Sequence, residues 1–362
     1  MRLHAKPAKD KTAGLIRLGM GWMLMLSMAL VPGNRALYAP DGAEALAADT
    51  PRQHKVIAYV QDMAGLSLRE EDAPYLDQVN YAFALLKDGK AELVHIDICA
   101  PVMHGKNGED GTIQGLFELA RIPYVGCGVL GSAVCMDKAV ANTIMDAAGV
   151  PHCKWASAIR AELEGDHKTL LDSIEQRLGY PIFVKPANAG SSVGITKATD
   201  RAVLEQAVVT ALKEDDKVVF EEFIDGQEVE CAAIGNPDDP ATVSTTRPGE
   251  ILAGAEFYTY DDKYKNGVSQ TVIPAHLSEE KLDEVRTEAR RAYLALGCAG
   301  LSRCDFFVER GTGRVLCNEL NTLPGFTSIS MYPKLMEHEG LSYAQLVDRL
   351  LQLALHRRKG AY

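Results

Sequence analysis

Two acidic side chains and an amide recur at strand spacing between residues 301 and 330, and their types are those that bind divalent cations. Asp305, Glu319 and Asn321 offer carboxylate and amide oxygens, the ligands that Mg²⁺ prefers when it also contacts nucleotide phosphates. The segment therefore predicts a magnesium-nucleotide site. The alternative is an ordinary hairpin with a solvated polar face, and the spacing taken by itself favours that plainer alternative.

A β-hairpin must position these side chains. Two apolar runs flank the turn Arg310–Arg314, whose glycines supply the positive φ angles that such turns need. With this turn at the tip, Asp305 lies opposite Glu319 and Arg303 lies opposite Asn321. Because strand side chains alternate, these polar residues share one face. The other face presents apolar side chains for burial: Phe306, Val308, Leu316 and Leu320.

Two lysines are placed to supply positive charge to phosphates. The segment Tyr180–Pro186 predicts a strand that contains Lys185. It runs into Ala187–Gly194, a loop of small residues whose backbone N–H groups can close over phosphates. Lys138 lies inside a predicted helix from Ser132 to Ala148. The loop is not a Walker loop, because G-x-x-x-x-G-K is missing from it.

Two further segments predict the surroundings of such a site. A strand at Lys217–Phe220 leads into the acidic stretch Glu221–Glu230, which could offer backbone groups to adenine and a carboxylate to ribose. A solvated acidic turn explains the same residues. The run Asp97–Met103 predicts a buried strand. The glycine-rich turn His104–Gly111 and a helix from Thr112 to Ala120 follow it, which is the plan of a ligand-binding α/β edge.

Composition limits the class of protein. A chain of 362 residues is long enough for about two or three packed domains, and a formal charge of −11 argues against a nucleic-acid surface. Eight cysteines without a C-x-x-C pair favour buried thiols in a reducing compartment, and hence a cytoplasmic protein. A homodimer is compatible with this composition.

The amino terminus conflicts with that location. Basic residues, an apolar run from Gly19 to Val31 and the small residues Ala45–Ala48 have the layout of a secretory signal, so secretion is the alternative. The apolar run is too short for a stable membrane span. A disordered leader explains residues 1–52 equally well.

Residues 55–93 resemble a different class of protein. Val56–Val60 and Val79–Leu86 predict two strands, the second of the N-Y-A-F type, and together they resemble the opening of chitinase-like (β/α)₈ glycoside hydrolases. The D-x-x-D-x-D-x-E sequence that supplies the acid in that family is missing from the chain. Glycosidase activity is therefore not expected. The chain looks like a fusion, made either naturally or by an assembly error.

Six ordered motifs together resemble the D-alanyl-D-alanine ligases of the ATP-grasp fold, over about residues 96–362. They are H-G-x-x-G-E-D-G, S-A-x-x-M-D-K, V-K-P-x-x-x-G-S-S-V-G, E-F-Y-x-Y-x-x-K-Y, R-x-D-F-F and N-E-L-N-T-x-P-G-F-T-S. The resemblance implies an α/β (α+β) architecture in which two subdomains sandwich ATP, after an incomplete or replaced amino-terminal α/β domain. The expected boundaries are a leader at 1–52, an amino-terminal region at 53–131, and ATP-grasp subdomains at 132–228 and 229–362. Within 53–131, residues 55–93 are hydrolase-like and residues 96–131 are ligase-like.

The resemblance implies a role for each matching residue. ATP would be bound by Lys138, Lys185, Ser192, Glu221, Glu222, Ile224, Glu228 and Lys263. Two Mg²⁺ or Mn²⁺ ions would be bound by Asp305, Glu319 and Asn321. The catalytic residues would be Arg303 and the N–H of Gly325 at an oxyanion, His104 near the first substrate, and Ser191 and Tyr264 in a closing lid. The second substrate would be bound by Ser330 and Met331.

The implied reaction is the ATP-dependent joining of two D-alanines through an acyl phosphate, for peptidoglycan precursor synthesis. One departure weakens this expectation. The family's usual G-G-x-S-x-E-x-x-V-S segment, whose Glu holds the ammonium of the first substrate, has no equivalent before Ile96. The alternative expectation is therefore a remnant that binds MgATP but does not place D-alanine.

Overall fold

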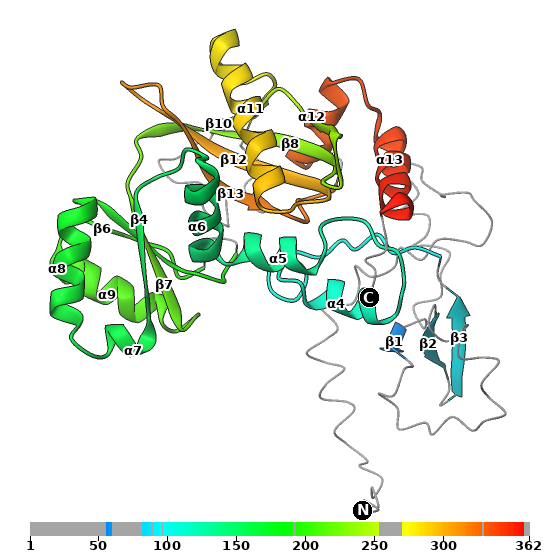
Figure 1. The fold of residues 1–362 in the computed structure, drawn as a ribbon, viewed down its shortest axis with the longest axis horizontal. Coiled ribbons are helices and arrows are strands. Elements are labelled where there is room, and N and C mark those ends of the chain that lie inside the picture. Colours follow the sequence, from blue (N-terminus) through cyan, green and yellow to red (C-terminus); the bar gives the residue numbers. More distant parts are fainter. Residues whose placement is uncertain are drawn as a thin grey trace, which may run out of the picture.

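A computed structural model describes residues 97–190, 193–252, 270–327 and 329–357, together with the backbone of three short strands before residue 97 (Figure 1). The expected leader at residues 1–52 lies outside the described residues, as do four predicted site residues: Ser191, Ser192, Lys263 and Tyr264. In the described part of the chain, no helix is both long enough and apolar enough to cross a membrane.

The largest sheet among the described residues has six strands, and it carries the predicted hairpin. Its order is β11-β10-β8-β12-β13, with β9 paired to β8, and its pairs are antiparallel. The strands are β8 (Gly226–Asn236), β9 (Asp239–Thr245), β10 (Gly249–Leu252), β11 (Gln270–Val272), β12 (Gly300–Glu309) and β13 (Val315–Asn321).

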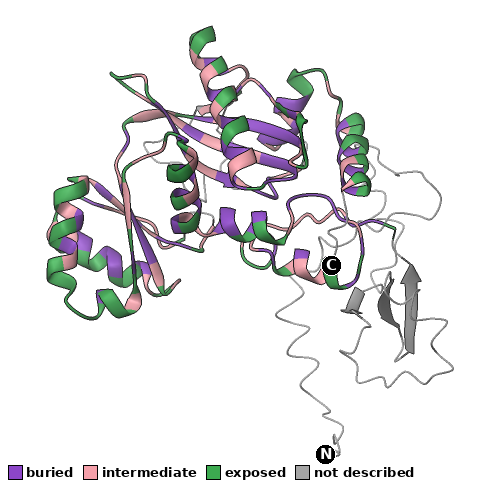
Figure 2. Cartoon of the chain, in the orientation of Figure 1, coloured by how far each residue is buried: buried purple, intermediate pink, exposed green. Residues whose placement is uncertain are grey.

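Alternating side chains divide the faces of this sheet between two hydrophobic cores. On β8, Val229, Cys231 and Ala233 pack in one core with α11 and α6, whereas Ala232 and Ile234 pack in another with α12 and α13. The central strands are therefore largely buried (Figure 2). The helices are α6 (Lys138–Ala148), α11 (Glu279–Ala295), α12 (Met331–His338) and α13 (Tyr343–His356).

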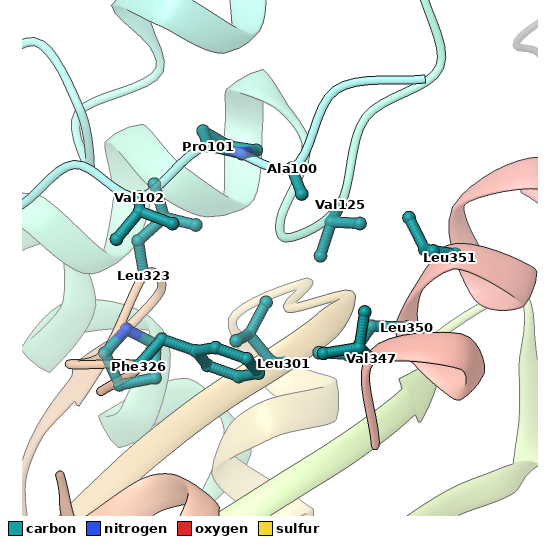
Figure 3. Close-up of a pocket in the computed structure, with 11 residues that line it drawn as sticks. Ala100, Pro101, Val102, Val125, Leu301, Leu323, Phe326, Val347, Leu350 and Leu351 are labelled. Atoms are coloured by element: carbon teal, nitrogen blue, oxygen red, sulfur yellow. The ribbon is translucent and has the colours of Figure 1, made fainter. Parts of the chain in front are cut away.

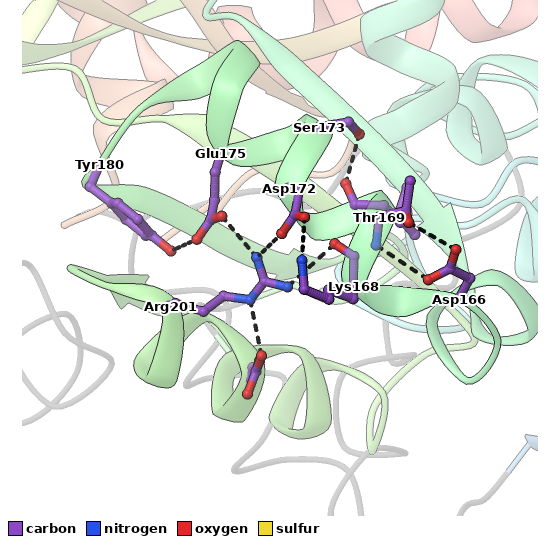
Figure 4. Close-up of polar contacts among 10 residues, drawn as sticks. Asp166, Lys168, Thr169, Asp172, Ser173, Glu175, Tyr180 and Arg201 are labelled. Atoms are coloured by element: carbon purple, nitrogen blue, oxygen red, sulfur yellow. Dashed lines mark hydrogen bonds and ion pairs between the residues drawn. The ribbon is translucent and has the colours of Figure 1, made fainter.

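A second sheet of four strands, in the order β4-β7-β5-β6, carries Lys185 and the loop that follows it. Helices α7, α8 and α9 share a hydrophobic core with this sheet. Arg201 joins α9 to α8, because its Nη1 lies 2.8 Å from both Asp172 and Glu175 (Figure 4). The elements are β4 (Trp155–Ile159), α7 (Arg160–Leu163), α8 (His167–Leu178), β5 (Ile182–Pro186), β6 (Thr196–Ala198), α9 (Arg201–Ala211) and β7 (Lys217–Glu222).

The strand predicted at Asp97–Met103 does not form. The segment has only an isolated parallel bridge, between Cys99 and Tyr124. One reason is Pro101, which has no N–H to donate to a neighbouring strand. The side chains of Ala100, Pro101 and Val102 instead line an apolar pocket together with side chains from the start of β12 and from α13 (Figure 3). The predicted helix after the glycine-rich turn does form, as α4 (Thr112–Leu119).

The helix predicted from Ser132 to Ala148 is two helices. The first is α5 (Val129–Met136), and α6 begins directly after Asp137. The Asp137 carboxylate accepts the first free N–H groups of α6, so it ends one helix and starts the next. Lys138 is therefore the first residue of α6, and the prediction that it lies well inside a helix is wrong.

Before residue 97 the structure gives the backbone of a three-stranded antiparallel sheet, in the order β1-β2-β3. Its strands are β1 (Val56–Tyr59), β2 (Ala82–Lys87) and β3 (Lys90–His95). The first two overlap the strands expected from the sequence. The architecture of the chain is thus mixed α/β (α+β) with antiparallel sheets, and that prediction is confirmed.

Candidate active site

The hairpin β12–β13 has the predicted register at its polar end. Asp305 pairs with Glu319, and Arg303 pairs with Asn321. The two glycines of the turn have φ angles of 83° and 68°, a conformation that glycine adopts without strain. The local pattern therefore places these four polar side chains on one face, as expected.

The prediction for Leu316 is wrong. An irregularity in the pairing after Asp305 places Cys317 opposite Phe306 and Leu316 opposite Phe307. Phe307 shares the face of Asp305, so Leu316 lies on the polar face instead of the core face. Leu316 is still buried, with 4% of its surface exposed, and it gives the polar face an apolar border.

Arg303 lies at the centre of this face. Its Nε and Nη2 donate to the two carboxylate oxygens of Asp305 at 2.7 and 2.6 Å, and its Nε lies 3.2 Å from Glu230 Oε2. Asn321 Nδ2 donates to Asp305 Oδ2 at 2.9 Å. Burial by itself would lower the pKa of Arg303, but the Asp305 and Glu230 carboxylates outweigh it and raise that pKa. The guanidinium is therefore a fixed cation.

Sequence reasoning assigned Glu228 to the nucleotide and gave no role to Glu230. The two lie on the same face of β8, because they are two residues apart. Glu228 is exposed and pairs in register with Phe307, whereas Glu230 pairs with Asp305 and is partly buried beside Arg303. The alternating acids of residues 228–230 indicated that this strand carries acidic side chains on one face. Only the pairing of β8 with β12 shows that Glu230 is the acid opposite Asp305.

The donor set of the hairpin fits a hard cation. Asp305 and Glu319 are opposite each other on adjacent strands, Asn321 follows on the same face, and all three present oxygen. The Glu319 side chain is 37% exposed, so one carboxylate is accessible. The described residues contain no group of three His, Cys, Asp or Glu that could hold a metal. An ion here would therefore take further ligands from phosphate oxygens or water, as Mg²⁺ commonly does.

Lys138 bridges the two sheets. Its Nζ donates to the carbonyl oxygen of Ala189, in the small-residue loop, at 2.8 Å, and it lies 3.8 Å from Glu319 Oε2. Its backbone N–H donates to Ala187 O at 3.1 Å. The side chain is only 13% exposed. The structure thus brings together the first predicted lysine, the predicted phosphate loop and a predicted metal ligand.

Lys185 forms a buried ion pair with Glu221, with 2.5 Å between Nζ and Oε2. Burial lowers the pKa of Lys185, but Glu221 more than offsets this, and the net direction is upward. Asn142 Nδ2 lies 3.5 Å from the other Glu221 oxygen. Glu319 also contributes to the raised pKa of Lys185, so this lysine lies within electrostatic reach of the hairpin.

Glu222 and Ile224 continue from this ion pair at the end of β7. The N–H of Glu222 donates to Lys154 O at 2.9 Å, and its carboxylate accepts the N–H of Lys154 at 2.9 Å. The N–H of Glu222 is therefore already paired within the protein. Ile224 is buried, with 8% of its surface exposed.

The loop after β13 contains the remaining predicted residues. His104 Nδ1 lies 2.9 Å from Leu323 O, which brings the glycine-rich turn to this loop. A Cβ on Gly325 would lie 2.8 Å from Ser330 Oγ, so Ser330 approaches the backbone of Gly325 closely. Ser330 Oγ accepts the N–H of Thr327 at 3.1 Å. Met331 begins α12 and is buried.

Sequence reasoning assigned no role to Glu109, which also lies here. Its carboxylate accepts the N–H of Gly105 at 2.6 Å and the N–H of Leu323 at 3.2 Å. The acid stands in the glycine-rich turn, but nothing in the sequence indicates a partner so far along the chain.

Comparison with known proteins places this arrangement in a family. A family model described as D-ala D-ala ligase C-terminus matches residues 144–352, and one described as D-ala D-ala ligase N-terminus matches residues 44–127. The D-alanine–D-alanine ligase of Acetivibrio thermocellus is 54% identical over 262 residues, which cover 72% of this chain and 69% of that protein. This chain belongs to the D-alanine–D-alanine ligase family.

Solved structures agree with this membership. The D-Ala:D-Ser ligase VanG from Enterococcus faecalis has a TM-score of 0.66 and 40% identity, covering 75% of this chain and 76% of its own. The D-alanine–D-alanine ligase from Coxiella burnetii has a TM-score of 0.64 and 34% identity, covering 80% and 78%. The ATP-grasp fold expected from the motifs is confirmed.

The prediction of a hydrolase-like fragment at residues 55–93 is not supported. The match to the amino-terminal ligase model, at residues 44–127, includes residues 55–93. The comparisons therefore give no support to the hydrolase-like fragment or to the fusion that was expected from it.

Proposed function

We propose that this member of the D-alanine–D-alanine ligase family joins two D-alanines to D-alanyl-D-alanine at the expense of ATP, for peptidoglycan precursor synthesis. The observation that carries the proposal is the position of Lys138, whose Nζ donates to Ala189 O in the small-residue loop and lies 3.8 Å from Glu319 Oε2 on the hairpin, where the two sheets approach each other. A magnesium nucleotide needs positive side chains for its phosphates and a carboxylate for its metal ion, and here the lysines and the hairpin carboxylate supply them. The comparisons do not favour the alternative of a ligase-defective remnant.

The nucleotide would lie between the two sheets. Lys138 and Lys185 would contact its phosphates, with Lys263 and Ser192 added by the family resemblance. The adenosine would lie near the end of β7, beside Glu221, Glu222, Ile224 and Glu228. Because the Lys185–Glu221 pair is already formed and buried, Lys185 would meet the phosphate charge with little rearrangement.

Asp305, Glu319 and Asn321 would hold two Mg²⁺ or Mn²⁺ ions, which when bound would neutralise the charge that develops on the transferred phosphoryl group. The pairing of β12 with β13 places Asp305 opposite Glu319, and so brings these two ligands together. Arg303 fixes the orientation of the Asp305 carboxylate through two hydrogen bonds.

The second half of the reaction would use the loop after β13. The amine of one D-alanine attacks the carbonyl carbon of the acyl phosphate of the other, and a tetrahedral oxyanion results. Its collapse re-forms the carbonyl, breaks the C–O bond to phosphate and, with loss of an amine proton, leaves the peptide bond and inorganic phosphate. Arg303 and the N–H of Gly325 would stabilise it, and each such donor contributes about 3 kcal/mol in comparable sites. His104 would lie near the first substrate and Ser330 and Met331 near the second, with Ser191 and Tyr264 closing over both.

The test of this proposal is direct product analysis. The purified full-length chain, given D-alanine, ATP and Mg²⁺, should form D-alanyl-D-alanine, with one phosphate released for each dipeptide by mass spectrometry and phosphate assay. L-alanine is the matched control and should give no dipeptide. ATP binding without any dipeptide would contradict the proposal and would favour the remnant.

We place the reaction in the cytoplasm, where ATP is available and where the eight free cysteines of the chain remain reduced. We keep the subdomain boundaries at 132–228 and 229–362, which leave Lys185 and the acidic hairpin in different subdomains.

The helix that begins with Lys138 provides a prediction about nucleotide binding. Asp137 caps α6 and pairs with Lys217 Nζ on β7 at 2.5 Å, so it fixes Lys138 against the smaller sheet. The variant Asp137→Ala should lose about 1 kcal/mol of stability, and its KM for ATP should rise by about tenfold.

The control is the equivalent cap of a distant helix. Asp166 accepts the N–H of Thr169 at the start of α8, so Asp166→Ala should cost comparable stability and leave the KM for ATP unchanged. Thermal unfolding and steady-state kinetics measure both effects. Equal KM values in the two variants would show that the Asp137 cap does not position Lys138.

A further inference from the structure

We propose that Glu109 is a positioning residue for the ligation step, because it holds the loop that carries His104 against the segment Leu323–Gly325. The inference rests on the function proposed above. It concerns a residue that would not touch substrate and would act through His104 and the Gly325 N–H.

Three hydrogen bonds define what we call the Leu323 clasp, formed by His104, Gly105, Glu109 and Leu323. Glu109 Oε1 accepts the N–H of Leu323 at 3.2 Å, and Oε2 accepts the N–H of Gly105 at 2.6 Å. His104 Nδ1 lies 2.9 Å from Leu323 O. Because a carbonyl oxygen only accepts, Nδ1 carries the hydrogen and donates it. Both ends of Leu323 are thus held from the same turn.

The side chain of Leu323 makes the clasp more rigid. It is buried, with 3% of its surface exposed, and lines the apolar pocket with Val102, Leu301 and Phe326 (Figure 3). A residue anchored by its side chain and bonded at both its N–H and its C=O has little freedom. Gly325 lies two residues after Leu323, so the fixed position of Leu323 also restricts the position of the Gly325 N–H.

The charge around Glu109 suits an orienting role. Burial raises the pKa of Glu109, and the N–H groups of Gly105 and Leu323, and then the charges of His104 and Arg303, only partly offset that rise. Its hydrogen bonds place the carboxylate between the His104 turn, near the first proposed substrate, and Leu323, two residues before Gly325.

The next residue in the chain provides a matched control. Asp110 accepts the N–H of Asn107 at 2.7 Å and that of Thr112 at 3.0 Å, so it stabilises only its own turn and the start of α4. A local effect on the glycine-rich turn should appear in both Glu109 and Asp110 variants. An effect transmitted through Leu323 should appear only in the Glu109 variant.

The experiment compares Glu109→Gln with Asp110→Asn in the full-length protein. A glutamine presents one acceptor where the carboxylate presents two, so one bond of the clasp is lost. We expect kcat/KM for D-alanine to fall by about tenfold to a hundredfold in Glu109→Gln, with the KM for ATP changed by less than about twofold. Asp110→Asn should keep both values. Glu109→Asp, which retains two acceptor oxygens on a shorter arm, should recover part of the loss.

Hydrogen–deuterium exchange gives a readout that does not depend on activity. The N–H of Leu323 should exchange faster in Glu109→Gln than in the wild type or in Asp110→Asn. Unchanged exchange, an unchanged kcat/KM, or an equal loss of ATP affinity in Glu109→Gln would overturn the proposal. A wild-type chain that makes no dipeptide would instead refute the proposed function, while the exchange measurement would still test the clasp.

Discussion

The variant Glu319→Gln should lose magnesium-dependent ATP turnover by about a thousandfold or more, a loss of about 4 kcal/mol, while its fold stays intact. Glutamine has nearly the same shape but no charge, so it binds a hard cation poorly. Glu319 is the accessible carboxylate of the hairpin, opposite Asp305 and 3.8 Å from Lys138 Nζ. Turnover measured against Mg²⁺ concentration, with circular dichroism on the same samples, checks this result.

The control lies on the same hairpin. Glu309 pairs with Arg314 at 2.8 Å beside the turn, at the far end of β12 from Arg303. Glu309→Gln removes a charge from the same hairpin four residues along β12 from Asp305, at the end beside the turn, so its turnover should match that of the wild type. If Glu319→Gln also turns over ATP at the wild-type rate, the metal assignment is wrong.

The variant Arg303→Lys should reduce dipeptide formation by about a hundredfold to a thousandfold. Lysine keeps the charge, but its single ammonium cannot reproduce the two parallel hydrogen bonds to Asp305 together with the contact to Glu230. Complete removal, as in Arg303→Ala, would also take the cation away from these two largely buried carboxylates, which costs about 3 to 5 kcal/mol of stability. Product formation and chemical denaturation measure the two effects separately.

Arg310→Lys is the matched change for Arg303→Lys. Arg310 follows β12, its side chain is 67% exposed, and its pair with Asp225 is 3.4 Å long. Exposed pairs of this kind contribute little, so neither rate nor stability should change measurably. A similar loss in both variants would mean that the effect of Arg303 is a general property of hairpin arginines and not of the polar face.

Local sequence determined much of the site. Side chains in a strand alternate, and the two glycines fix where the chain turns, so the sharing of one face by Arg303, Asp305, Glu319 and Asn321 followed from spacing alone. The helix α4 also agrees closely with its predicted range. Both features depend on residues near one another in the chain.

The spacing of residues did not predict where α6 begins or on which face of β13 Leu316 lies. Asp137 accepts hydrogen bonds from the first N–H groups of α6, so Lys138 is at the start of a helix and not in its interior. A bulge in β13 turned Leu316 to the polar face. In each case two local structures satisfy the same pattern, and packing against the rest of the protein selects one of them.

Only the tertiary structure decided which acids belong to the site. Glu230 faces Asp305 because β8 pairs with β12, and Glu109 holds Leu323, which lies 214 residues further along the chain. Strand spacing fixes the face of a strand on which a side chain lies, but not the element that comes to lie against that face. That choice depends on how apolar surface is buried over the whole chain, as when the two faces of β8 divide between α11 and the pair α12 and α13.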